Sequence, residues 1–244
     1  MKTLISFLLI VSCFFSYSQD TDEPVKVRYN LNGSPENSNP LRGDQNRVFT
    51  IKGSPYLNET HQPGSIVNGL KTTKALLRYN AYLDQFQILD EQKAKHFVLR
   101  VPNIKIILHE KSYTLLQYEE TVRDRALYYL APSTTTTTKK EGYFELLNSG
   151  TTTLYLKTFK RIPKFKLAEH GYERMQVPTF LTVEHYYIKR SNRPAQRIAL
   201  TKKEVLFALN DKYNEVRSYI KKNKLKIKTV DDVIQVLTYY DSLN

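Results

Sequence analysis

Short segments of β-type residues, separated by turn residues, recur along the middle of this 244-residue chain and restrict its fold more than any other feature. They are rich in Val, Ile, Tyr, Phe and Thr, which favour extended backbone. Pro102-Asn103 and an Asn-Ser-Gly turn at residues 148–150 separate neighbouring segments. The pattern predicts an antiparallel meander, open or barrel-like, in one β-rich domain over residues 47–200. The expected strands are residues 48–52, 66–67, 75–82, 86–89, 96–101, 104–108, 113–118, 126–130, 143–147, 153–159, 180–189 and 197–200.

Residues 133–138 consist of one serine and five threonines, followed by Lys139 and Lys140. Such low complexity is typical of a solvated connection between strands. We therefore expect a loop here.

The pattern changes to helical spacing in the tail, residues 201–244. Thr201 and Glu204 have the spacing of a capping box, in which each side chain satisfies a backbone amide of the other. Asn210 or Asp211 is expected to cap a second helix, and Thr229 begins a third with two acidic residues in its first turn. The chain is therefore predicted to have the α+β fold class, with an antiparallel β part followed by about three short helices packed on it.

The same tail is strongly basic. The segment from Lys202 to Lys228 contains nine basic and three acidic residues. Its net charge is therefore +6, compared with +13 for the whole chain. If the second helix continues to Lys228, Lys221, Lys224 and Lys228 share a face; if residues 224–228 are extended, Leu225 and Ile227 point inward and the lysines outward. One interpretation is a solvated helix face that keeps the protein soluble, and the other is a docking surface. The candidate binding residues are Lys202, Lys203, Arg217, Lys221, Lys222, Lys224, Lys226 and Lys228.

The N-terminus is typical of an export signal. A basic Lys2 precedes an apolar run that is too short to cross a bilayer, and small residues place a cleavage site before Gln19. Residues 1–18 are thus interpreted as a signal peptide and residues 19–46 as a flexible polar leader. The alternative is a lipobox, in which Cys13 becomes the lipid-bearing first residue. Both alternatives place the protein outside the cytoplasm, in the periplasm or at the outer-membrane periphery of a Gram-negative bacterium.

Charge and location together indicate the kind of partner. Cys13 is the only cysteine, so the sequence excludes a disulfide scaffold. Removal of the signal takes away only Lys2 and leaves a charge of +12, which attracts polyanions. In an exported protein we expect an acidic envelope component or a protein partner rather than nucleic acid, with peripheral membrane contact as a further option.

Signatures of catalysis are missing from the sequence. The five histidines show no metal-ligand spacing, and there is neither a glycine-rich phosphate loop nor a nucleophile elbow. Glu184 and His185 could form an acid–base couple, but neighbours on a strand point to opposite faces. The prediction is a non-catalytic envelope protein with a binding or structural role and no cofactor. The alternatives are a membrane-inserted outer-membrane β-barrel and a glycan-acting envelope enzyme with an unidentified site.

Several short motifs, in their order, resemble an uncharacterised family of secreted envelope proteins of Bacteroidota. They are Gly-Ser-Pro-Tyr-Leu at 53–57, Leu-Arg-Tyr-Asn-Ala-Tyr at 77–82, Gly-Tyr-Phe-Glu-Leu-Leu at 142–147, Tyr-Tyr-Ile at 186–188 and Tyr-Ile-Lys-Lys-Asn-Lys-Leu-Lys at 219–226. The resemblance implies an envelope location and no established activity. Family members commonly carry a longer insert where this chain has only residues 165–179.

Overall fold

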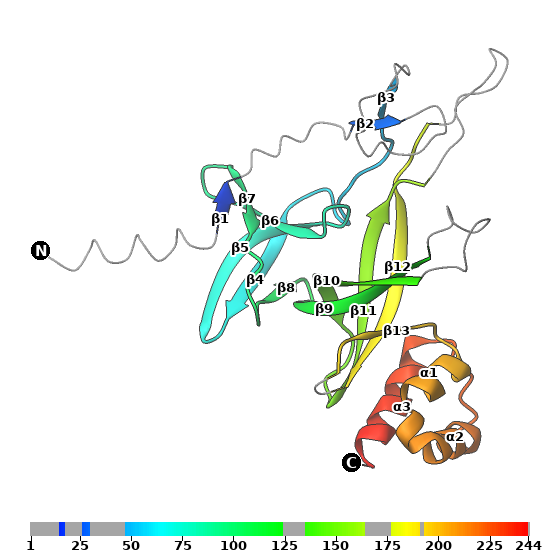
Figure 1. The fold of residues 1–244 in the computed structure, drawn as a ribbon. Helices are drawn as coiled ribbons and strands as arrows, with labels where there is room; N and C mark the ends of the chain where they lie inside the picture. The colour runs from blue at the N-terminus through cyan, green and yellow to red at the C-terminus, as the bar shows by residue number, and fades with distance from the viewer. Residues whose placement is uncertain are drawn as a thin grey trace, which may run out of the picture. The chain divides into compact units, whose positions relative to one another are not determined.

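The computed structural model of the chain describes residues 15–17, 26–29, 47–123, 135–163, 177–190 and 193–243. Most of the described elements are antiparallel strands, and three short α-helices follow them at the C-terminus (Figure 1). The predicted α+β class is therefore confirmed. The elements are β1 (Phe15–Tyr17), β2 (Lys26–Tyr29), β3 (Arg47–Thr50), β4 (Gln62–Asn68), β5 (Lys71–Asn80), β6 (Gln85–Leu89), β7 (Lys95–Val98), β8 (Lys105–Leu108), β9 (Lys111–Arg123), β10 (Thr135–Leu146), β11 (Thr152–Arg161), β12 (Leu181–Arg190), β13 (Gln196–Ile198), α1 (Lys202–Ala208), the 3₁₀ turn η2 (Asn210–Lys212), α2 (Tyr213–Lys222) and α3 (Val230–Asp241).

The chain divides into two compact units, and the first comprises Met1–Pro63, Ala75–Leu99 and Phe159–Val183. In it, β5 pairs with β6, β6 with β7, and β7 with the three-residue strand β1, all antiparallel. Its core is formed by fully buried side chains such as Leu77 and Phe86. The ring of Phe86 also lies against Tyr79 on the neighbouring strand, with centroids 4.7 Å apart.

The second unit comprises Gly64–Lys74, Arg100–Thr158 and Glu184–Asn244. Its strand order is β4-β8-β9-β10-β11-β12-β13. The longest pairing joins β9 to β10, from Ser112 opposite Leu146 to Arg123 opposite Thr135. The prediction of a loop at residues 133–138 is wrong, because Thr135–Thr138 belong to β10. Threonine is β-branched and fits extended backbone, so β9 and β10 continue pairing through the polar run. The strand expected at residues 126–130 lies outside the described residues.

Helix capping follows the sequence at two of the three helices. Thr201 Oγ1 accepts a hydrogen bond from the Glu204 amide (3.3 Å), and Thr229 Oγ1 accepts from the Asp232 amide (3.2 Å). The prediction that Asn210 or Asp211 caps the second helix is wrong. Both residues form the turn η2 instead, and α2 begins after Lys212 without a side-chain cap.

The helices bury one apolar face against the strands of the second unit. Leu154, Ile188 and Ile198 of β11, β12 and β13 join the helical side chains in one core. Each fully buried aliphatic side chain contributes roughly 1.5–3 kcal/mol, so this core holds the helices in place. Among the described residues, no helix combines the length and apolar character needed to cross a membrane. The helical core residues are Val205, Leu206, Ala208, Leu209, Val216, Ile220, Ile227, Val233, Val236, Leu237 and Tyr240.

Candidate docking surface on the C-terminal helices

The eight predicted binding residues come from three segments of the helical group. Lys202 and Lys203 lie in the first turn of α1, while Arg217, Lys221 and Lys222 lie on α2; Lys224, Lys226 and Lys228 follow it. All eight are exposed. Arg217 and Lys221 are four residues apart and therefore neighbours on one helix row.

The segment after α2 settles which of the two expected geometries applies. Helix α2 ends at Lys222, so it does not continue to Lys228. Ile227 is only 1% exposed and Leu225 is half-buried, whereas the lysines on either side of them are exposed, as expected for the non-helical alternative. The backbone is not a regular strand, because Lys224 and Ile227 both have φ of 52°. A β-branched residue rarely adopts this conformation, so packing of Ile227 in the helical core holds the turn.

None of these eight cationic groups forms an ion pair with a carboxylate in the part of the chain that the structure describes. Cations elsewhere do: Lys111 Nζ lies 2.9 Å from Glu145 Oε2, and Arg190 pairs with Asp211. The helical group therefore presents positive charge to solvent that its own acids do not neutralise.

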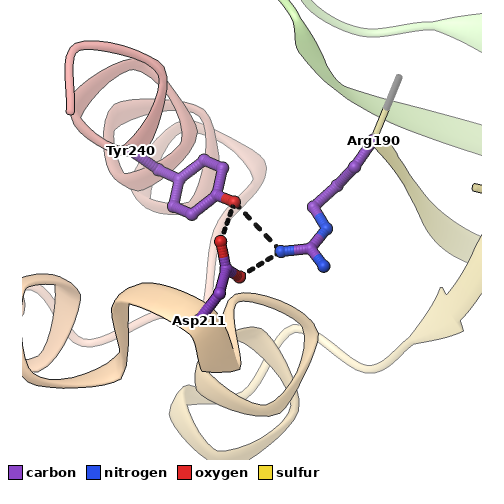
Figure 2. A network of polar contacts seen from close by, with 3 residues as sticks. All are labelled: Arg190, Asp211 and Tyr240. Atoms are coloured by element: carbon purple, nitrogen blue, oxygen red, sulfur yellow. Dashed lines mark hydrogen bonds and ion pairs between the residues drawn. The ribbon is translucent and has the colours of Figure 1, made fainter. Parts of the chain in front are cut away.

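A polar network fixes this group to strand β12 (Figure 2). Arg190 Nη1, from the end of β12, donates to Asp211 Oδ1 in η2 and to the Tyr240 hydroxyl in α3 (3.0 Å). The Tyr240 hydroxyl in turn donates to Asp211 Oδ2 at 2.6 Å. Three elements thus meet at one carboxylate.

The titration of the network reflects this arrangement. Burial raises the pKa of Asp211, but hydrogen bonds from Tyr240 and Arg190 outweigh it and hold the pKa below its ordinary value. Burial, together with donation to Asp211, raises the pKa of Tyr240. Both shifts favour the charge states that the network requires, a carboxylate and a neutral phenol.

A second contact joins α3 to the start of β11. Both carboxylate oxygens of Asp241 accept from the backbone amide of Thr152 at 3.0 Å. Gly150 lies beneath this carboxylate, and a Cβ at that position would come within 2.7 Å of Asp241 Oδ2. Between α2 and α3, the rings of Tyr219 and Tyr239 stack with centroids 4.0 Å apart. No local pattern in the sequence indicates these contacts, because their partners are far apart in the chain.

Two of the described histidines, His96 and His185, contact charged side chains. His96 Nε2 lies 2.9 Å from Asp90 Oδ2, and this contact lowers the pKa of Asp90. His185 Nε2 lies 2.8 Å from an Arg197 guanidinium nitrogen, so it accepts a hydrogen bond there and its lone pair is already engaged. Glu184, His185 and Arg197 line a shallow pocket of about 400 Å³. An engaged lone pair does not suit the acid–base couple considered for Glu184 and His185.

Metal-binding geometry is absent from the described residues: no three His, Cys, Asp or Glu side chains are grouped so as to hold an ion. Cys13 and His170 lie outside those residues. In comparisons with known proteins, no family model, curated protein or solved structure matches the chain. The inference of a docking surface therefore depends on the exposure and charge of the eight basic residues.

Proposed function

We propose that this protein is a non-catalytic exported envelope protein that docks on an acidic envelope component through the cations of its C-terminal helices. The observation that carries the proposal is the set of eight exposed basic residues without a carboxylate partner among the described residues. The basic n-region, apolar run and cleavage site within residues 1–18 support export.

Attachment of the helices favours docking over a purely solubilising role. A solubilising charge works equally well on a mobile tail, whereas recognition gains when the charges have fixed positions. Here Arg190, Asp211 and Tyr240 connect the helices to β12, and Asp241 connects α3 to the start of β11. The backbone that carries the cations is therefore already ordered, and binding costs only the conformational entropy of their side chains.

The test is association of the purified protein with native envelope fragments, measured by co-sedimentation. Basic residues near an anionic surface contribute about 1 kcal/mol each, so changing Lys221, Lys222 and Lys224 to Glu should weaken association by roughly 100-fold or more. High salt should weaken the wild type in the same way, because it screens the contact.

A matched control reverses the same number of charges elsewhere. Lys74, Lys93 and Lys105 are also exposed and have no ion pair with described residues, so their change to Glu gives the same net charge. We expect this variant to retain most of the association. Equal losses in both triple variants would show that only net charge matters, and unchanged association in the helix variant would leave its lysines a role in solubility alone.

A further inference from the structure

A polar pocket of about 470 Å³ lies in the second unit, and none of the eight helical cations lines it. Two features of the backbone form it. Tyr118 of β9 and Ala195 make an isolated parallel bridge, which brings Arg193 beside β9. Glu119 and Lys139 lie directly opposite each other on β9 and β10. The lining residues used below are Gln117, Tyr118, Glu119, Lys139, Lys189 and Arg193.

The wall of the pocket is supported by a packed aromatic cluster. Tyr118 is 8% exposed, and its ring makes edge contacts with Phe144 and Tyr187, with centroids 5.2 and 5.7 Å apart. Behind it, the buried Lys157 places Nζ 5.3 Å from the Tyr118 centroid and 4.9 Å from that of Phe144. These contacts hold the Tyr118 side chain in position at the wall.

The lining itself is unbalanced in charge. Lys139, Lys189 and Arg193 are cationic and only Glu119 is acidic, which gives a net charge of +2. Although Lys139 faces Glu119 in register, the two side chains form no ion pair, and within the described residues Arg193 has none either. The next residue on the same strand, Lys140, does pair with Glu120. Lys139 and Arg193 therefore remain available to an anion.

We propose that this pocket binds an acidic sugar, with the cations of Lys139 and Arg193 holding its carboxylate. Gln117 supplies an amide and Glu119 an acceptor, which suit sugar hydroxyls. The volume falls within the range of small-molecule sites and has room for about two sugar rings, more than a single inorganic anion fills. A nucleobase is a poorer fit, because the Tyr118 ring is packed against other rings and offers no open face for stacking.

The experiment is calorimetric titration of the full chain with short oligouronates, using oligogalacturonate and oligomannuronate as probes. A neutral galacto-oligosaccharide and inorganic phosphate are the comparison ligands. We expect binding of at least one oligouronate, no binding of the neutral sugar, and weaker binding of phosphate. Lys139→Gln and Arg193→Gln should each weaken oligouronate binding roughly tenfold, as expected for loss of a charge-assisted hydrogen bond. Gln117→Ala should weaken oligouronate binding and leave phosphate binding unchanged.

The matched control is Lys140→Gln, one residue along β10, where the side chain lies on the opposite face. It should bind like the wild type, and so should the Lys221, Lys222 and Lys224 triple variant, since this site is separate from the proposed docking surface. Thermal unfolding of each variant checks that the fold is kept. Failure of both oligouronates to bind, phosphate binding as tight as theirs, or equal loss in the Lys140→Gln control would each overturn the proposal.

Discussion

At the scale of single residues, the carboxylate of Asp211 connects three elements of the second unit. It accepts from Arg190 on β12 and from Tyr240 on α3 while lying in η2 itself. The Asp211 side chain is 43% exposed and that of Arg190 13%, so solvent screens part of the interaction. The network therefore stabilises the helical group by a moderate amount.

We predict that Asp211→Asn lowers the free energy of unfolding by about 1–2 kcal/mol, because the amide replaces a charged acceptor while Arg190 stays largely buried. Urea denaturation at neutral pH measures the change, and Glu215→Gln on the exposed side of α2 is the control. The folded pKa of Asp211 is depressed, so its contribution is present above pH 3.8 and is lost as the pH falls through the folded pKa. The difference between variant and wild type should therefore shrink in acid; a difference that stays constant would contradict the role of the charge.

At the scale of elements, the strands of the second unit carry tyrosines into the core. Burial raises the pKa of Tyr113 on β9, with a further increase from Glu145 nearby. Burial likewise raises the pKa of Tyr155 on β11, despite an opposing hydrogen bond with Thr153, and that of Tyr187 on β12, despite the charge of Arg197. The folded sheet thus favours neutral phenols in three of its strands.

This arrangement predicts alkaline unfolding. A group with a raised folded pKa contributes stability that is complete below its unfolded pKa, here 10.0, and is lost as the pH rises towards the folded value. Tyrosinate absorbance and near-ultraviolet circular dichroism should therefore change together above pH 10. Tyr113→Phe should move the transition to higher pH, and Tyr213→Phe, at an exposed position, should leave it in place. Titration of the core tyrosines before any loss of dichroism would contradict the prediction.

Local patterns in the sequence predicted most of these elements, and the errors have physical causes. The caps at Thr201 and Thr229 were predictable because a cap depends on residues only three apart. The prediction of a cap at Asp211 is wrong because two residues that are distant in the sequence, Arg190 and Tyr240, bind the same carboxylate. Composition predicts a loop at Thr135–Thr138, but their partner strand β9 continues beside them. The polar pocket depends on the bridge between Tyr118 and Ala195, which no local pattern encodes.

At the scale of the whole molecule, the two proposed sites divide the positive charge between different tasks. The pocket cations line a concave site together with one carboxylate, which suits a small ligand. The helical cations are open to solvent on a fixed group of helices, which suits an extended acidic surface. Under the proposed function, both tasks would take place outside the cytoplasm, and N-terminal processing would decide whether the protein reaches its partner.

The two processing routes differ in what they leave of the fold, because β1 lies between the two candidate start sites. Cleavage before Gln19 removes Phe15–Tyr17 and leaves β7 as an edge strand, whereas lipidation at Cys13 keeps β1 paired with β7. We predict cleavage before Gln19, since the apolar residues Phe14 and Phe15 continue the hydrophobic run past the cysteine. Intact-mass analysis of the exported protein should give a chain that starts at Gln19 and carries no lipid.

Hydrogen exchange gives an independent measure of the same event. In the full chain, β7 residues pair on one side with β6 and on the other with β1, where Phe97 lies opposite Ser16. Loss of β1 exposes the amides on that side of β7 to water, so they should exchange faster in the exported protein than in the unprocessed chain. Amides of β6, which pair with β5 and β7, should exchange at the same rate in both forms. A lipid-bearing Cys13 with unchanged exchange in β7 would replace this route with the lipoprotein one, and docking would then begin from a membrane anchor.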